Sequence, residues 1–183
     1  MSPKSQTPGP LRPPRPLSDF EEHTYQIAQR FAPRTDAPDR WSIDIPALHL
    51  TFHSASLTPS PSISFDMTIA PKHCNYLGNL HGGCAATLFD ALSSMILLSV
   101  SKPGFFQLGG VSRHLDVTYL RPVSQGEKVR LVARLVNMGK RLALLRGEIL
   151  RVVKDDKGEE VEGELCMVCD HEKANTDPEP GKL

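Results

Sequence analysis

The sequence predicts an α+β domain in which a curved antiparallel sheet wraps around one long, apolar helix. The first observation is an almost wholly apolar run from Gly83 to Val100. The second is that segments with strand-like character lie on both sides of that run. The third is that short turn sequences separate the later segments, as between antiparallel neighbours. A helix that is apolar nearly all round must be covered on most sides, and a curved sheet can cover it.

Two strands are expected before the apolar helix, over Ala47–Leu57 and Ser62–Ile69. The second shows the clearest two-residue alternation in the chain, with apolar and polar residues taking turns as far as Ile69. Pro71 ends it, because proline cannot donate to a strand ladder.

Four more strands are expected after the helix, separated by three turn sequences that contain glycine, proline or asparagine. They cover Val111–Leu120, Lys128–Met138, Arg141–Val153 and Glu160–Cys169. With the first two strands they make the sheet, so residues 47–170 are predicted to form the main domain.

The two ends of the chain have a different composition. Residues 1–17 are rich in proline and are predicted to be a disordered tail. Ser18 followed by Glu21 fits a capping box, so residues 18–46 are predicted to hold a short helix and a loop. Residues 171–183 are polar and are predicted to be a frayed C-terminal tail.

Composition excludes several classes of partner. The chain has 183 residues with 21 basic and 21 acidic side chains, which argues against a nucleic-acid partner and against strong attraction to a membrane surface. The apolar run carries Asp90 and several hydroxyl residues, so it reads as a buried helix without stable membrane insertion. No secretory signal is visible, and we expect a cytoplasmic location with reduced cysteines. Mitochondrial import is an alternative, and so is peroxisomal import, because Gly181-Lys182-Leu183 resembles the Ser-Lys-Leu address.

The start of the apolar helix carries the first chemical signal, His81-Gly82-Gly83. Two glycines let a ligand approach the backbone, and the first amides of a helix have no intrahelical partner. Such amides can bind an anion, or an oxygen that becomes one during acyl transfer. The alternative is that the glycines only permit a tight turn into the helix.

Asp90 is the second signal. It is the only Asp, Glu, Lys or Arg between Lys72 and Lys102. A carboxyl group in an apolar setting needs a partner, and it can serve as a general base or acid. The alternatives are an exposed strip of helix or a purely structural hydrogen bond. Asp90 lies about 12 Å along the helix from its start, which is long for one reaction centre unless two subunits share the site.

These residues carry a resemblance. The pattern made by Asn75, Gly78, Leu80–Gly83, Ala86–Leu88 and Asp90 resembles the signature of hotdog-fold thioesterases of the phenylacetate-pathway type, which include acyl-CoA thioesterase 13-like proteins. Later segments are similar as well, namely Gly110–Ser112, Asp116–Pro122 and Gly139–Ala143. The resemblance covers Phe65–Cys169, and the hotdog fold has the helix and sheet arrangement predicted above.

The resemblance implies hydrolysis of a fatty or aryl acyl-CoA without a metal or other cofactor. Asn75 and the Gly82 amide would hold the thioester carbonyl, Asp90 would activate water, and Ser112 would help to place that water. His81 would shape or polarise the site. The family dimerises, so that Asn75 and Gly82 of one subunit would face Asp90 and Ser112 of the other, and pairs of dimers are common.

Further residues are candidates for contact with the substrate. Gly83 would let the ligand approach the helix start, and Arg113, Lys140 and Arg141 would meet the CoA phosphates, although each could be an ordinary solvated charge. Two other functions remain open. One is a non-catalytic acyl-CoA-binding module, and the other is a hotdog dehydratase or hydratase that uses a His with a carboxylate.

Overall fold

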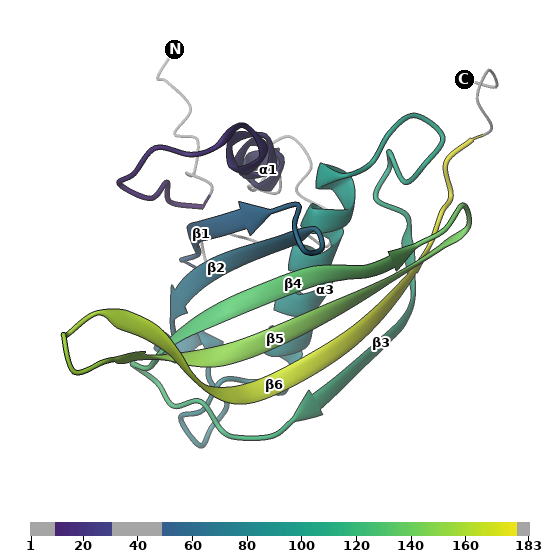
Figure 1. Cartoon of the computed structure of the whole chain (residues 1–183). Coiled ribbons are helices and arrows are strands. Elements are labelled where there is room, and N and C mark those ends of the chain that lie inside the picture. Colours follow the sequence, from purple (N-terminus) through teal and green to yellow (C-terminus); the bar gives the residue numbers. More distant parts are fainter. Residues whose placement is uncertain (1–9, 31–48, 179–183) are drawn as a thin grey trace, which may run out of the picture.

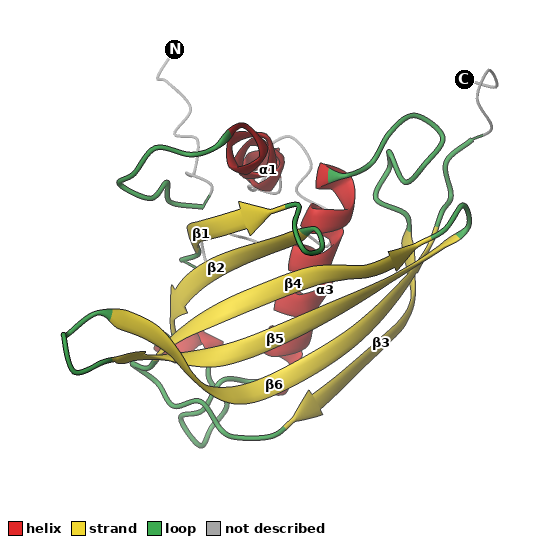
Figure 2. Ribbon diagram, in the orientation of Figure 1, coloured by secondary structure: helices red, strands yellow, loops and turns green. Residues whose placement is uncertain are grey.

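The computed structural model describes residues 10–30 and 49–178, which form a sheet wrapped around a helix (Figure 1). The helices are α1 (Asp19–Arg30) and α3 (Gly82–Ser99), with a 3-10 turn η1 (Pro71–His73). The strands, shown in yellow in Figure 2, are β1 (Thr51–Ser56), β2 (Ser62–Thr68), β3 (Val111–Tyr119), β4 (Lys128–Met138), β5 (Leu142–Lys154) and β6 (Glu160–Ala174). The predicted α+β hotdog architecture is confirmed.

The sheet has the strand order β1-β2-β4-β5-β6-β3, and every neighbouring pair is antiparallel. The chain leaves α3 and returns as β3 at the far edge of the sheet, beside β6 (Figure 1). This order leaves β3 as one edge strand and β1 as the other. β3 is the first strand after α3 in the chain. It runs back beside the helix, so its side chains lie along α3.

The apolar side of α3 fills the concave side of the sheet. Leu88, Leu92, Met95 and Ile96 are fully buried there. By length and composition α3 could cross a membrane, but 61% of it is buried inside the protein, which accounts for its apolar character. One stripe of α3 stays accessible, and its partly exposed residues recur every four positions: Gly82, Ala86, Asp90, Ser94 and Leu98.

The N-terminal region is more ordered than predicted. The capping box is confirmed, since Ser18 N–H donates to Glu21 (3.0 Å) and Glu21 N–H donates to Ser18 Oγ (3.3 Å). The prediction of a disordered tail is wrong for residues 10–17. Leu11 exchanges backbone hydrogen bonds of 3.0 Å with Leu50 and Phe52.

The reason is the exposed edge of β1. An edge strand presents unpaired backbone groups, and a segment that pairs with them is held in place despite its prolines. Arg15 adds a hydrogen bond of 2.7 Å to the carbonyl of His53 and an ion pair with Glu21. Residues 1–9 and 31–48, which include part of the predicted loop, lie outside the described residues.

The predicted C-terminal boundary at residue 170 is also wrong. β6 continues to Ala174, because it lies between two partners, β3 and β5, that both extend that far. His171 pairs in register with Leu115 and Leu145, and Lys173 pairs with Ser112 and Ala143. Pairing on both sides holds a polar segment whose composition alone indicated a tail. Gly181-Lys182-Leu183 lies outside the described residues, so the location of the protein remains a prediction.

Candidate active site

The first turn of α3 presents a free backbone donor at Gly82. His81 is the N-cap residue, and its Nδ1 accepts the amide hydrogen of Gly83 at 2.9 Å. The amide of Gly82 has no hydrogen-bond partner in the part of the chain that the structure describes. Of the two predicted glycines, Gly82 therefore offers a donor, whereas the Gly83 amide is occupied by His81. In the neutral ring this bond leaves the His81 proton on Nε2.

Asn75 lies in a closed loop directly before the helix. Its side-chain oxygen accepts the amides of Leu77 (2.9 Å) and Asn79 (3.2 Å). The loop is closed by a bridge between Cys74 and Leu80, next to the start of α3. Since the Asn75 oxygen is used by the loop, its side-chain NH₂ is held in one orientation, and it has no partner among the described residues.

Tyr119 supports the same turn from β3, and the sequence analysis assigned it no role. Its hydroxyl donates to the Gly82 carbonyl at 2.9 Å. A Cβ atom on Gly82 would lie 3.2 Å from the Tyr119 ring, which explains why this position has no side chain. The sequence signal for Tyr119 was its place in the Asp116–Pro122 segment that carries the family resemblance.

Asp90 lies on the accessible stripe of α3, and its carboxylate has a hydrogen-bond partner. Its side chain is 43% exposed, so it is neither fully buried nor free. Ser112 Oγ of β3 donates to Asp90 Oδ1 at 2.9 Å, and the two predicted residues are thus together within one chain. His171 Nε2 of β6 lies 2.8 Å from Ser112 Oγ, and its Nδ1 lies 2.6 Å from Ser93 Oγ.

The hydrogen bonds that lead from His171 to Asp90 have one consistent direction. Burial lowers the pKa of His171 to about 4, and the positive charge of Lys173 acts in the same direction, so the ring is neutral near pH 7. Ser112 gives its only proton to the Asp90 carboxylate, and therefore His171 Nε2–H donates to Ser112. On the other side of the ring, Ser93 Oγ lies 2.6 Å from His171 Nδ1 and 2.6 Å from the Phe89 carbonyl, and its single proton can serve only one of these acceptors. The donors from His171 to Ser112 and from Ser112 to Asp90 both point toward Asp90.

Sequence reasoning missed His171 because it fell in the predicted tail. A usable signal was present, since the alternation of β6 continues beyond Cys169. The residues of β6 that are buried on the helix side are Met167, Cys169, His171 and Lys173.

The first turn of α3 and the Asp90 cluster do not meet within one chain. Gly82 and Asp90 are eight residues apart on α3, which is about 12 Å along the helix axis. The structure therefore brings Asn75, His81 and Gly82 together at one place, and Asp90 with Ser112 at another. The pairing of His81 with Asp90 that a dehydratase reading requires is not formed in the chain.

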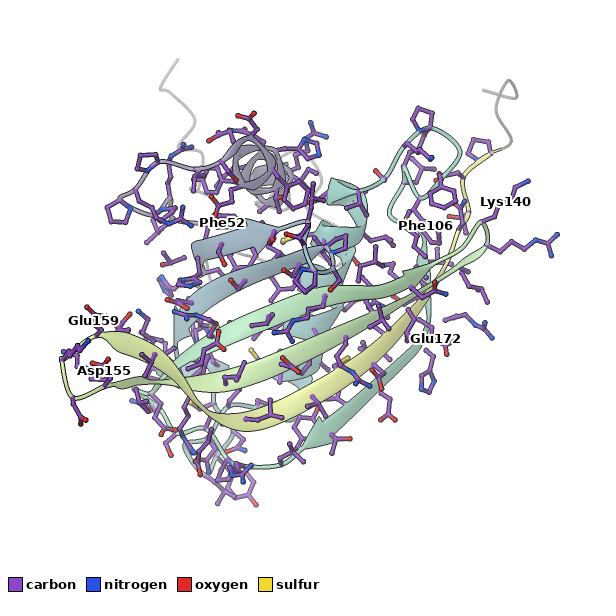
Figure 3. All side chains as sticks on the ribbon, in the orientation of Figure 1. Phe52, Phe106, Lys140, Asp155, Glu159 and Glu172 are labelled. Atoms are coloured by element: carbon purple, nitrogen blue, oxygen red, sulfur yellow. The ribbon has the colours of Figure 1, made fainter. Side chains whose placement is uncertain are left out.

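The predicted phosphate contacts lie near the Ser112 end of β3. Lys140 and Arg141 form the exposed β4–β5 hairpin, where Lys140 extends away from the ribbon (Figure 3). The Arg141 carbonyl accepts the amide of Asn175 at 2.8 Å, which places the hairpin beside the end of β6. Arg113 forms an exposed ion pair of 3.6 Å with Glu172, whereas Lys140 and Arg141 have no ion pair among the described residues.

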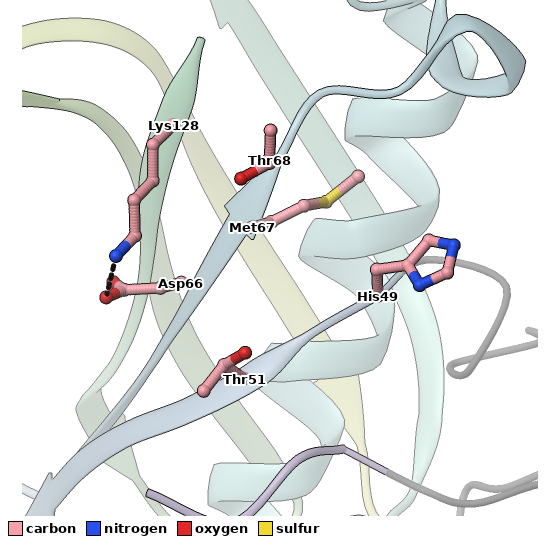
Figure 4. Close-up of a pocket in the computed structure, with 6 residues that line it drawn as sticks. All are labelled: His49, Thr51, Asp66, Met67, Thr68 and Lys128. Carbon is pink, nitrogen blue, oxygen red and sulfur yellow. Dashed lines mark ion pairs between the residues drawn. The ribbon is translucent and has the colours of Figure 1, made fainter. Parts of the chain in front are cut away.

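A separate hollow of about 260 Å³ lies on β1, β2 and β4 (Figure 4). Its lining includes Asp66 and Lys128, whose charged atoms are 3.4 Å apart. Asp66 also binds Arg130 at 2.9 Å, so the charges in this hollow already have partners. No residue of the predicted site lines it. Among residues 10–30 and 49–178, no group of three His, Cys, Asp or Glu side chains could hold a metal ion.

The family model of the thioesterase superfamily matches residues 77–156, which include Gly82, Asp90 and Ser112 but not Asn75. A solved structure of thioesterase superfamily member 2 from Mus musculus is 25% identical, with a TM-score of 0.62, and the match covers 86% of this chain and 98% of that one. Over residues 77–156 this chain thus resembles the thioesterase superfamily in sequence, and its fold is the hotdog fold.

Among curated thioesterases, acyl-coenzyme A thioesterase 13 from Mus musculus is 37% identical over 78 residues, covering 43% of this chain and 53% of that protein. The chain therefore spans about half the length of the curated relatives that it matches first. A Streptococcus mutans protein solved with acetyl-CoA shares the fold, with 18% identity and a TM-score of 0.52, over 69% of this chain and 88% of that one.

Proposed function

We propose that this protein is a thioesterase that hydrolyses acyl-CoA thioesters to a free acid and CoA, at a site shared by two copies of the chain. The observation that carries the proposal is the Asp90 cluster. A partly exposed carboxylate is held at the end of a chain of donors from His171 and Ser112. This arrangement orients one carboxylate oxygen and leaves the other available to a water molecule.

The thioester carbonyl would bind at the first turn of α3. The Gly82 amide lies at the positive end of the helix dipole, and the Asn75 NH₂ is oriented by its own loop. Both are donors that need no rearrangement when negative charge builds on the carbonyl oxygen. Preorganised donors of this kind are worth about 3 kcal/mol each in acyl transfer. His81 would contribute by ordering this turn through Gly83.

Asp90 would act as the general base. It takes a proton from water as the water oxygen bonds to the thioester carbon, and the carbonyl oxygen becomes an oxyanion. When the oxyanion collapses, the carbon–sulfur bond breaks and CoA leaves as a thiolate. The proton held by Asp90 then passes to the thiolate or to solvent, so the carboxylate is regenerated. Ser112 orients the base through Oδ1.

Two subunits are required because the donors and the base are about 12 Å apart on one helix. Two features favour assembly of two copies. The accessible stripe of α3 carries small residues, which allow close approach, and the outer edge of β3 has no strand partner in the described chain. A homodimer, or a pair of dimers, would put Gly82 of one copy opposite Asp90 of the other.

The acyl-CoA class of substrate is supported by the printed names of relatives, which include acyl-coenzyme A thioesterase 13 and a fold neighbour bound to acetyl-CoA. Lys140 and Arg141 are suited to CoA phosphates, since both are exposed and neither forms an ion pair among the described residues. The acyl group, fatty or aryl, is open to direct measurement.

The test is release of free thiol from short, medium and long acyl-CoAs and from an aryl-acetyl-CoA. The native protein is compared with Asp90→Asn and with Asp156→Asn, which changes an exposed carboxylate on the distant β5–β6 turn. We expect release by the native protein and Asp156→Asn, and a loss of at least about a hundredfold in Asp90→Asn.

Two outcomes would overturn the proposal. Binding of acyl-CoA without release of thiol from any member would indicate a binding module. A change in enoyl absorbance without release of CoA would indicate a dehydratase or hydratase.

A further inference from the structure

β6 places a second buried basic side chain beside Asp90. Lys173 lies two residues after His171 on the same face of the strand, and it is only 5% exposed. Its Nζ donates to Ser94 Oγ at 2.7 Å. Ser94 Oγ in turn donates to the backbone carbonyl of Asp90 at 2.7 Å. This second chain of donors ends at the backbone carbonyl of Asp90, whereas the one from His171 ends at its carboxylate.

The hydrogen-bond partner of this ammonium is a neutral hydroxyl. In the described chain, Lys173 has no carboxylate within ion-pair distance. Burial lowers the pKa of Lys173, and the negative charge of Asp90 opposes that shift. A buried ammonium without a carboxylate partner is costly, so its charge depends on the nearest acid.

The other titratable groups that interact with Asp90 carry no positive charge near pH 7. His171 of β6 is neutral, because its pKa is about 4. Cys169 of β6 is a neutral thiol, since burial raises its pKa to about 12, with smaller contributions from Asp170, Asp116 and Asp90. Lys173 is thus the cation among these three residues of β6, and on β3 the charged group of Arg113, next to Ser112, is exposed and paired with Glu172.

We propose that Lys173 is a positioning residue that keeps Asp90 ionised when acyl-CoA and the partner subunit cover it. This inference rests on the proposed function. Covering a carboxylate removes water and favours its protonated form, which cannot act as a base. A buried ammonium, held in place by Ser94, opposes that change at no cost in reorganisation. Without it, the proposed base would be lost at a higher pH.

The test compares the pH dependence of kcat/KM in the native protein, Lys173→Met and Lys157→Met. Methionine keeps an unbranched side chain without the charge, and Lys157 is an exposed lysine on the β5–β6 turn. We expect the acid side of the Lys173→Met profile to move to higher pH by about one unit, with a much smaller loss at alkaline pH. Lys157→Met should follow the native profile. A merely structural role would instead lower the rate by the same factor at every pH, and this result would overturn the proposal.

A second measurement does not depend on turnover. The Cε carbon of Lys173 can be followed by ¹³C NMR during a pH titration, with its signal assigned by its absence in Lys173→Met. The negative charge of Asp90 raises the pKa of Lys173, so the midpoint should be lower in Asp90→Asn than in the native protein. Equal midpoints would contradict the coupling between the two groups and with it the role given to Lys173. If the native protein releases no CoA, the proposed function fails, and this titration still decides whether Lys173 and Asp90 are coupled. If Lys173→Met does not fold, Lys173→Gln replaces it.

Discussion

The first turn and the middle of α3 are organised in different ways. At the first turn the ordering contact is local, since His81 binds Gly83 two residues along the chain. In the middle, Asp90 is bound by Ser112, 22 residues away, and its neighbours Ser93 and Ser94 are bound by residues 78 and 79 positions away. The carbonyl-binding end is thus ordered by a contact between residues that are close in the sequence, whereas the base is held by residues of the sheet that are far away in the sequence.

The two ends also have opposite chemistry. The first turn offers unpaired N–H groups and the positive end of a helix dipole. The middle offers the Asp90 carboxylate, which accepts a hydrogen bond from Ser112, and Ser112 in turn accepts one from His171. Neither place holds both a carbonyl site and a base, so the comparison indicates that one chain carries two half-sites.

The sharpest way to break this comparison is complementation. Asp90→Asn and Asn75→Ala should each lose about a hundredfold or more in kcat/KM, because each removes one half-site. Co-refolded in equal amounts, they should regain about a quarter of native activity, since half of the twofold dimers carry one intact site of two. The measurement is thiol release before and after mixing. Activity that stays at the sum of the two variants would show that the site is not shared.

The packing around the middle of α3 should be more sensitive to acid than the first turn. The pKa of His171 is lowered from 6.5 to about 4 by burial, so the unfolded chain binds a proton in this window and the folded chain does not. Stability that is present above pH 6.5 is therefore lost as pH falls toward 4, by up to about 3 kcal/mol. Urea unfolding of the native protein and of His171→Gln at several pH values measures this loss. His171→Gln should lose less than the native protein, and an exposed His114→Gln should behave like the native protein.

At the first turn, Gly82→Ala tests the carbonyl site. The added Cβ would lie 3.2 Å from the Tyr119 ring, so the turn or the ring must shift by a few tenths of an ångström. We expect kcat to fall by about tenfold or more, because oxyanion stabilisation depends on the position of this amide. The matched control is Gly139→Ala, where the nearest atom would lie at an ordinary 3.6 Å. Equal kinetics for the two variants would remove Gly82 from the site.

The smallest effect is expected from Tyr119→Phe. It removes the hydrogen bond of 2.9 Å to the Gly82 carbonyl but keeps the ring. A net loss of about 1 kcal/mol for such a bond corresponds to a few-fold decrease in kcat. A much larger decrease would mean that the first turn depends on the sheet as strongly as Asp90 does, and the contrast between the two ends would be lost.

Most of the elements could be predicted because their signals are local. The bounds of β4 agree with the prediction, and those of β3 and β5 differ by about a residue at an end. The start of α1 followed from a capping box formed by Ser18 and Glu21. The errors lie where composition opposed pairing. Residues 10–17 contain prolines and the end of β6 is polar, yet both are held by backbone bonds to neighbouring strands.

By itself the sequence determined the helix that must be covered, the two-residue alternation that supplies the sheet, and the glycine turn with its free amide. These follow from neighbours along the chain, so spacing and residue type are enough to predict them. Only the tertiary structure decided that His171 and Lys173 lie behind Asp90, because the register of β6 against β3 and β5 sets their positions. A carboxylate takes its chemistry from the charges and donors packed around it, and those come from strands far away in the sequence.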